Sequence, residues 1–185
     1  MPVRNDRPPG EVTIRKLEGP PEPGFDCGNP EQNEFLYERA WADQQESTSV
    51  TYQYFVDGAF AGFATVAMDG LALAFRERGP HIRYETVGAT KLAQLGVDVR
   101  FQGHGLGETI VADVIGLAIR GSRQIGCRFV AVDARSGLDG WYERLAFKRN
   151  KLMQERLTRI ALDKNRDLAR LGTSMRFDIR TGPSA

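Results

Sequence analysis

The sequence predicts a mixed α/β domain in which a central twisted sheet carries helices on both faces. Three observations lead to this prediction. Residues 50–66 alternate with period two around Asp57-Gly58, a pattern typical of a β-hairpin. Residues 91–99 alternate again and run into a glycine-rich turn, beyond which apolar residues recur at helical spacing. A short apolar strand follows that helix, so this part of the chain is a βαβ unit.

The length of the chain, 185 residues, matches one ordinary domain of roughly 100–200 residues. We expect that domain to span residues 11–180, between a flexible N-terminal arm at 1–10 and a flexible tail at 181–185. Both ends are rich in residues that interrupt regular structure. The formal net charge of +1 excludes an overall basic field that would draw the protein to nucleic acid or to a membrane.

The cellular location is predicted from cysteine usage and from the absence of targeting signals. Cys27 and Cys127 are too few for a disulfide scaffold and are expected to be reduced. The N-terminal residues lack the apolar stretch of a signal peptide, and no apolar run is long enough to span a bilayer. These features predict a cytoplasmic protein that makes no membrane contact.

The first predicted elements are a strand at residues 11–17 and a helix that follows a loop at 20–28. Asn29 is suited to cap this helix, Pro30 suits its first turn, and Gln32 stands where a capping box needs an acceptor. The helix is expected to end before residue 47. Its apolar stripe consists of Phe35, Leu36, Ala40 and Trp41.

The middle of the chain is predicted as strands on either side of a poorly patterned segment. After the hairpin, we expect a strand extension at 71–75 and a loop through Gly79-Pro80. The next strand covers 91–99, and the helix after the glycine turn ends between Gly121 and Gly126. A buried parallel strand is expected at 127–132.

The C-terminal part is predicted to contain an amphipathic helix and a last sheet strand at 175–179. Cations outnumber anions in the segment before that strand, which gives a local positive charge despite the near-neutral chain. A solvated helix face and a nucleic-acid contact both explain this charge. The cations are Lys148, Arg149, Lys151, Arg156, Arg159, Lys164, Arg166 and Arg170, against Glu155, Asp163 and Asp167.

The glycine-rich turn at 102–107 opens a helix, and the first N–H groups of a helix form an anion site at the positive end of its dipole. Glycines there allow phosphate oxygens to approach the chain. The turn lacks the Gly-Lys-Ser/Thr ending of a nucleoside triphosphate loop, and Glu108 replaces the third glycine of a dinucleotide fingerprint. The pyrophosphate of another cofactor therefore fits best, while a purely steric turn and a misread nucleotide site stay open.

The turn, written Gln102-x-x-Gly105-x-Gly107, and the later segment 141–147 (Trp-Tyr-Glu-Arg-Leu-Ala-Phe) together resemble the GNAT acetyltransferase superfamily. The resemblance extends from about residue 11 to residue 147. It implies a GNAT-like mixed sheet and acetyl-CoA as the cosubstrate. The residues it assigns to acetyl-CoA are Leu95, Gly96, Val97, Gln102, Gly103, His104, Gly105, Leu106 and Gly107.

The resemblance also implies a catalytic residue, because Tyr142 matches the tyrosine that protonates the coenzyme A thiolate. A core tyrosine packed beside its aromatic neighbours is the structural alternative. Ala146 departs from the glycine that the family usually has. No base is assigned, although Glu77, Glu85, Asp98 and His81 are candidate proton acceptors. No metal site is predicted, since neither histidine belongs to a cluster of metal ligands.

A narrower resemblance connects the N-terminal half, including Phe25-Asp26-Cys27-Gly28 and Gly62-Phe63, with toxins that acetylate aminoacyl-tRNA. The predicted activity is acetyl transfer to a primary amine of a small molecule, a protein or an aminoacyl-tRNA. A domain that binds acyl-CoA without catalysis is an alternative. The resemblance leaves open a homodimer and an antitoxin partner.

Overall fold

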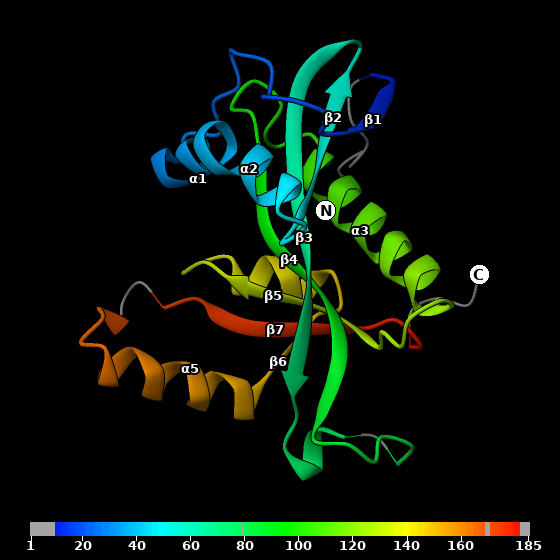
Figure 1. Ribbon diagram of the computed structural model, residues 1–185, viewed down its shortest axis with the longest axis vertical. Helices are drawn as coiled ribbons and strands as arrows, with labels where there is room; N and C mark the ends of the chain where they lie inside the picture. Colours follow the sequence, from blue (N-terminus) through cyan, green and yellow to red (C-terminus); the bar gives the residue numbers. More distant parts are fainter. Residues whose placement is uncertain (1–9, 79, 169–170, 182–185) are drawn as a thin grey trace, which may run out of the picture. The chain divides into compact units, whose positions relative to one another are not determined.

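The fold of residues 10–78, 80–168 and 171–181 is described by a computed structural model, which confirms the mixed α/β prediction. Seven strands are hydrogen-bonded in the order β1-β2-β3-β4-β5-β7-β6 (Figure 1). The chain forms two compact units: the first contains the residues up to Ala67 together with Leu92–Gly116, and the second contains Met68–Lys91 and the residues from Leu117. The expected arm and tail fall almost entirely outside the described residues, and the single domain at 11–180 stays a prediction.

The strands of the first unit are β1 (Val12–Lys16), β2 (Val50–Val56) and the first part of β3 (Ala59–Ala72). Both neighbouring pairs are antiparallel. Asp57 and Gly58 have φ angles of 48° and 82°, which are the positive values that a two-residue hairpin turn requires. The predicted hairpin is therefore confirmed.

One helical segment follows the first loop and consists of α1 (Pro30–Glu34), the π-helical turn η1 (Phe35–Arg39) and α2 (Ala40–Gln45). The Asn29 side chain accepts a hydrogen bond from the Gln32 N–H at 3.1 Å, as the sequence predicts. The π turn was not predicted. Phe35, Leu36 and Ala40 are buried among the aromatic side chains of β2 and β3.

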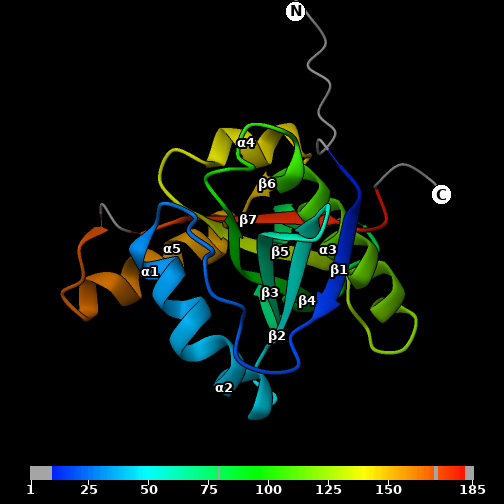
Figure 2. The same ribbon diagram turned by 90° about the horizontal axis from the view of Figure 1, so that it is seen from above.

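The other face of this part of the sheet is covered by α3 (Leu106–Ser122), as Figures 1 and 2 show. The predicted apolar positions Ile110, Val111 and Val114 are buried. Asp113 accepts a hydrogen bond from the buried Tyr54 hydroxyl at 2.9 Å, which joins the helix to β2. The helix ends at Ser122, between Gly121 and Gly126 as predicted.

The second unit contains β5 (Phe129–Ala134), β6 (Lys148–Arg149) and β7 (Thr173–Asp178), and β7 is antiparallel to both of the others. Its helices are α4 (Asp139–Arg144) and α5 (Lys151–Asp163), and both contact β7. No helix among the residues described here has the length and apolar character needed to cross a membrane.

The segment that the sequence left poorly defined differs from expectation at both ends. β3 continues to Ala72, so the predicted strand extension at 71–75 is confirmed for residues 71 and 72 only, and a 3-10 turn, η2 (Phe75–Glu77), follows. β4 (Thr86–Val97) begins five residues earlier than predicted. Gly88 lies in this early part of the strand, and a Cβ atom there would lie 2.3 Å from the Gly126 carbonyl oxygen. β5 begins at Phe129, two residues later than predicted, and in the loop before it the Arg128 N–H donates to the Gly88 carbonyl oxygen at 2.8 Å.

Candidate active site

The glycine turn has the backbone conformation that an anion site at a helix N-terminus requires. Gly103 and Gly105 have φ angles of 77° and 78°, in the left-handed region that side chains disfavour. The 17-residue helix α3 begins directly afterwards at Leu106. A Cβ atom at Gly103 would meet nothing within 4 Å, so conformation and not crowding requires glycine there. The first N–H groups of the helix follow directly after the turn, and such groups are suited to bind an anion.

The end of β4 leads into this turn and is held rigidly from one side. The Leu95 carbonyl oxygen accepts a hydrogen bond from the Gln32 side chain of α1 at 2.8 Å. A Cβ atom at Gly96 would lie 2.5 Å from Phe63 Cε1, so only glycine allows the strand to pack this closely on the aromatic core. Val97 completes the three residues predicted to face the acetyl-pantetheine arm.

The Gln102 side chain is hydrogen-bonded within the protein. Its side-chain amide donates hydrogen bonds to the carbonyl oxygens of Val97, at 2.9 Å, and Cys27, at 3.1 Å. The side chain therefore joins the turn to the end of β4 and to the loop before α1. His104 is exposed at the tip of the turn. The contribution of both residues to acetyl-CoA binding stays a prediction.

Tyr142 lies in α4 of the second unit and is only 5% exposed. Its ring packs against Trp141 and Phe147, with centroid separations of 4.7 and 5.3 Å. Burial raises the pKa of the hydroxyl to about 12. The phenol is therefore protonated at neutral pH, which is the state that a general acid needs.

The turn after α4 explains why Ala146 is unusual. Ala146 has a φ angle of 65°, and its N–H donates to the Glu143 carbonyl oxygen at 3.0 Å. The Phe147 N–H donates to the Tyr142 carbonyl oxygen at 3.1 Å. This pair of bonds is the Schellman motif, whose left-handed position normally carries glycine. The helix exit keeps the glycine conformation even though alanine occupies it.

The model of the acetyltransferase (GNAT) family matches residues 13–147, which include the glycine turn and Tyr142. The chain belongs to this family. Members of this family are acetyltransferases, so the protein is an enzyme. The alternative prediction, a domain that binds acyl-CoA without catalysis, is set aside.

A curated relative of this GNAT protein is a tRNA-acetylating toxin of Mycobacterium tuberculosis (strain ATCC 25618 / H37Rv). It is 30% identical over 115 residues, which cover 60% of this chain and 67% of the relative. The solved structure of AtaT complexed with acetyl-methionyl-tRNAfMet has a TM-score of 0.74 at 18% identity, over 92% of this chain and 96% of that chain. A mutant AtaT toxin bound to the C-terminus of the antitoxin AtaR and acetyl-CoA has a TM-score of 0.68 at 17% identity, over 92% and 94%. At these identities the two structures establish similarity of fold alone.

An ion pair that the sequence did not predict stabilises the GNAT turn. Asp98 is completely buried, and its carboxylate accepts hydrogen bonds from Arg100 at 2.7 and 2.9 Å and from the Asp26 N–H at 3.1 Å. Burial raises the pKa of Asp98, but these hydrogen bonds and the Arg100 charge outweigh burial and hold it below its ordinary value. Asp98 is therefore a charged anchor at the end of β4, which makes it a poor proton acceptor.

The other candidate bases of this GNAT chain also have structural partners. Glu77 forms an ion pair with Arg176 at 3.0 Å, in which both side chains are nearly buried, and Glu85 pairs with Arg156. His81 is exposed. Across the described ranges, no group of three or more His, Cys, Asp and Glu side chains could hold a metal ion.

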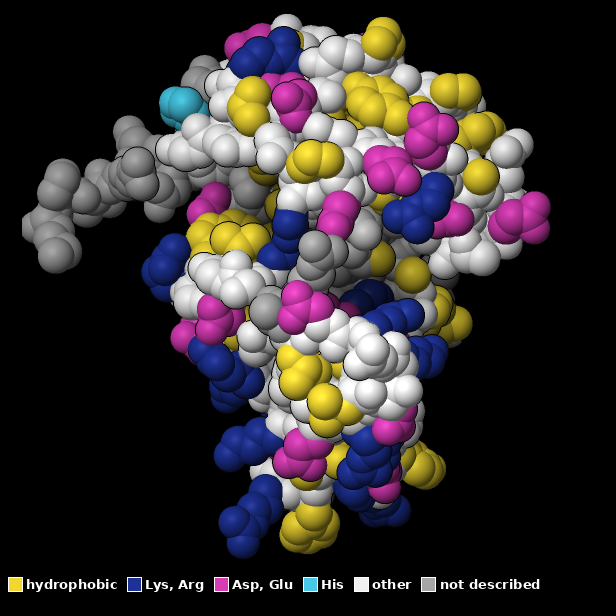
Figure 3. All heavy atoms as spheres, turned by 90° about the vertical axis from the view of Figure 1, so that its left-hand side faces the viewer, with side chains coloured by type: hydrophobic (Ala, Val, Ile, Leu, Met, Phe, Trp, Pro, Cys, Tyr) yellow, Lys and Arg dark blue, Asp and Glu magenta, His cyan; other side chains and the backbone are white. Residues whose placement is uncertain are grey.

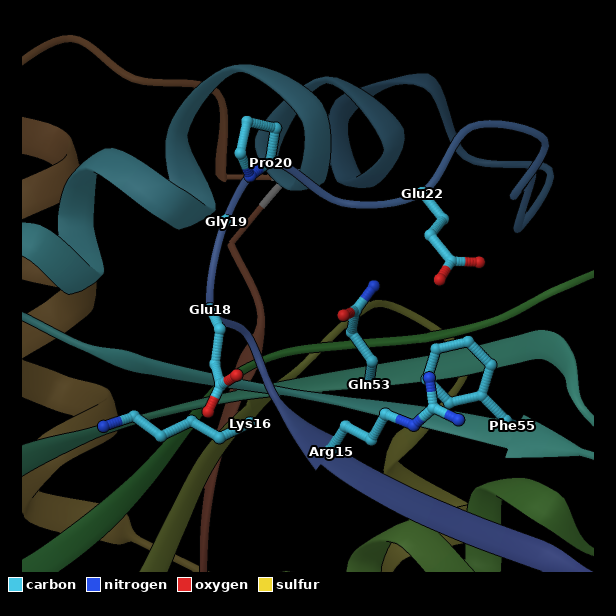
Figure 4. A pocket seen from close by; sticks show the side chains of 8 residues that line it. All are labelled: Arg15, Lys16, Glu18, Gly19, Pro20, Glu22, Gln53 and Phe55. Atoms are coloured by element: carbon cyan, nitrogen blue, oxygen red, sulfur yellow. The ribbon is translucent and has the colours of Figure 1, made fainter.

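A hollow of about 420 Å³ lies at the β1 edge of the first unit, beneath the chain at residues 18–22. Figure 4 shows Arg15 and Gln53, which are register partners on β1 and β2, beside this hollow. The Arg15 guanidinium lies over the Phe55 ring, and the buried Gln53 Nε2 has no hydrogen-bond partner among the described residues. None of the residues predicted to bind acetyl-CoA lines this hollow, so it is separate from the glycine turn.

Proposed function

We propose that this acetyltransferase binds acetyl-CoA at the turn formed by residues 102–107 and transfers the acetyl group directly to the amino group of an aminoacyl-tRNA. The observation that carries the proposal is the glycine turn itself. Its two left-handed glycines, the open space above Gly103 and the start of a 17-residue helix together form an anion cradle. A diphosphate-containing cosubstrate fits that cradle.

The acceptor class is supported by the curated relative, which is a tRNA-acetylating toxin, and by the local charge near the C-terminus. Among the cations of that segment, Arg149 pairs with Asp139 and Glu143, and Arg156 pairs with Glu85. Lys151, Arg159 and Lys164 remain exposed. Exposed cations can bind the phosphates of an RNA even though the whole chain is nearly neutral.

In the proposed mechanism the chain positions the reactants and supplies one proton. When bound, acetyl-CoA supplies the activated thioester. Backbone groups at Leu95–Val97 orient its carbonyl group and stabilise the negative charge that forms on the oxygen when the amine attacks. The carbon–nitrogen bond forms and the carbon–sulfur bond breaks, and the Tyr142 hydroxyl donates its proton to the departing sulfur. The attacking nitrogen loses one proton to water, and the Tyr142 oxygen takes up one proton from water, so the tyrosine is restored. No covalent enzyme intermediate is required.

The donor half of the proposal is tested by calorimetric titration with acetyl-CoA, NAD and ATP. We expect the protein to bind acetyl-CoA but neither NAD nor ATP. Gly105→Glu should abolish acetyl-CoA binding, because the new side chain is negatively charged and is disfavoured at a φ angle of 78°. Gln124→Glu is the matched control, since it adds the same charge at an exposed position outside the turn and should bind acetyl-CoA normally. Circular dichroism checks that each variant is folded. Failure of the unmodified protein to bind any coenzyme A ester would remove the proposal.

The acceptor half is tested by supplying radiolabelled acetyl-CoA with a mixture of aminoacyl-tRNAs, with lysine-containing peptides or with free amines. Label should appear on aminoacyl-tRNA only. Tyr142→Phe should lower kcat by about 10²-fold or more and leave acetyl-CoA affinity unchanged, as expected for loss of a general acid. Cys27→Ser should retain activity, because the transfer is direct.

A homodimer, an antitoxin partner and a cytoplasmic location also remain proposals for this chain. AtaT, whose fold is similar, has been solved with the C-terminus of the antitoxin AtaR. Light scattering during size-exclusion chromatography distinguishes a monomer from a dimer. Growth arrest on expression, relieved by Tyr142→Phe, would support a toxin that needs an antitoxin.

A further inference from the structure

Two aromatic side chains project from the segment that joins β3 to β4 in the second unit. Phe75 is 84% exposed and Tyr84 is 77% exposed. The Leu73 N–H donates a hydrogen bond to the Glu85 carbonyl oxygen at 2.8 Å. Phe75 is two residues from Leu73 and Tyr84 is next to Glu85, so this hydrogen bond holds the two aromatic positions near each other. Their large exposed faces contribute no packing to the core, which makes them available to a partner.

The charges next to these rings are predominantly positive. Arg76 and Arg83 are exposed, and neither pairs with a carboxylate in the part of the chain that the structure describes. The acidic residues of the segment are already neutralised. Glu77 is paired with Arg176 and accepts a hydrogen bond from the Lys151 N–H at 2.9 Å, and Glu85 is paired with Arg156.

The same contacts place helix α5 beside the aromatic segment. Glu77 accepts a hydrogen bond from the Lys151 N–H at the N-terminus of α5, and Glu85 binds Arg156, five residues further along the helix. Arg159 is three residues after Arg156, so it lies on the same face of the helix and is exposed. In Figure 3, lysine and arginine side chains gather on the lower half of the face shown, which carries α5 and the β3–β4 segment.

We propose that Phe75, Arg76, Arg83, Tyr84 and Arg159 form a surface that binds single-stranded RNA. The two rings stack on unpaired bases, and the three guanidinium groups bind the phosphates between and beside them. The inference rests on the proposed function, because the end of a tRNA that carries the amino acid is single-stranded. It adds a binding surface made of residues outside the glycine turn and Tyr142.

The apolar character of this surface favours RNA over a membrane. In the described β3–β4 segment the large exposed apolar groups are two flat rings, whereas the neighbouring Ile82 is partly buried against the core cluster that contains Leu73 and Phe129. An aliphatic patch that could enter a bilayer is therefore missing from this described segment. Every base has a face on which a ring can stack, so the surface should bind RNA with little sequence preference.

The test measures fluorescence anisotropy of a short, unstructured oligoribonucleotide over a range of salt concentrations. Phe75→Ala/Tyr84→Ala should weaken binding by about thirtyfold or more, the effect of two lost stacking contacts, with an unchanged salt dependence. Phe75→Tyr/Tyr84→Phe should bind like the unmodified protein. Arg76→Ala/Arg83→Ala should lower the slope of log K against log salt by about 1.4, at about 0.7 for each lost phosphate contact.

The matched control is Arg123→Ala/Ile125→Ala, which removes an exposed cation and an exposed apolar side chain from another loop. This variant should bind RNA normally, and all variants should bind acetyl-CoA with unchanged affinity. Equal RNA binding by the control and by Phe75→Ala/Tyr84→Ala would overturn the proposal. So would binding to vesicles of anionic lipid in place of the oligoribonucleotide.

Failure of this proposal and failure of the proposed function give different results. If the unmodified protein acetylates aminoacyl-tRNA and Phe75→Ala/Tyr84→Ala has the same KM and kcat, the RNA surface lies elsewhere and the function stands. If the protein binds the oligoribonucleotide through the two rings but acetylates no aminoacyl-tRNA, the surface stands and the acceptor is wrong.

Discussion

Replacing Ala146 by glycine tests the left-handed conformation that ends α4 directly after Tyr142. Ala146 has a φ angle of 65°, and a residue with a Cβ atom loses about 1–2 kcal/mol in this region. Glycine removes that strain but loses about 0.5–1 kcal/mol more backbone entropy on folding. The two Schellman hydrogen bonds involve backbone atoms only, so they persist. The net expectation is that Ala146→Gly stabilises the protein by about 0.5–1 kcal/mol.

Urea denaturation of both proteins measures this difference as a shift in midpoint at constant slope. In a thermal scan the same change corresponds to an increase in Tm of about 1–4 °C. Ala42→Gly is the matched control, because Ala42 is exposed within α2 and has ordinary helical geometry. The control should lose about 1 kcal/mol. If Ala146→Gly is destabilised as much as the control, the left-handed assignment at residue 146 is wrong.

Three further predictions concern stability and ionisation. Asn29→Ala should cost about 1 kcal/mol in urea denaturation, because the Gln32 N–H loses its cap acceptor, whereas Asn29→Asp should cost little. Burial raises the pKa of Glu77, but backbone N–H groups and Arg176 outweigh burial and hold it below 4.5, so its stabilisation is present above pH 4.5 and lost as the pH falls further. Glu77→Gln should lower the free energy of unfolding at neutral pH by about 3 kcal/mol, and that free energy should fall less steeply in acid than it does for the unmodified protein. Parallel plots of unfolding free energy against pH for the two proteins would refute this account. The ultraviolet titration of tyrosinate should show a group near pH 12 that Tyr142→Phe lacks, and a Tyr142 transition near pH 10 would contradict its burial.

Structural features that depend on one short segment of the chain could be predicted from the sequence. The Asn29 cap and the Asp57-Gly58 turn depend on residues within four positions of each other, and both have the predicted geometry. The glycine turn before α3 is a local signal of the same kind. Its assignment as the acetyl-CoA site, together with that of Tyr142 as the acid, stays a prediction for the titrations and variants above.

Features that depend on distant residues could not be predicted in this way. Glu77 occurs in a segment without periodicity, and its partner Arg176 is 99 positions away. A glycine such as Gly88 is unfavourable in a strand judged by sequence alone, and the close contact with the Gly126 backbone that requires it becomes visible only in the structure. The same limit applies to Gln102, whose motif indicates cofactor binding but whose amide is bound to Val97 and Cys27. Tertiary contacts override local pattern at each of these positions.

The π-helical turn at Phe35–Arg39 changes the angle about the helix axis between two glutamine side chains, Gln32 and Gln44, that bind different strands. Gln32 donates to the Leu95 carbonyl oxygen of β4, while Gln44 donates to the Leu17 carbonyl oxygen and accepts from the Thr51 N–H of β2. Twelve residues of regular α-helix would separate their directions by about 120°, whereas absorbing one residue in a wider turn reduces the difference to about 20°. The extra residue therefore lets the two glutamines of one helical segment bind β4 and the β2–β3 hairpin at the same time. Loss of a single residue between 35 and 39 would turn the Gln44 side chain away from β2. This helical segment should therefore tolerate substitutions far better than deletions.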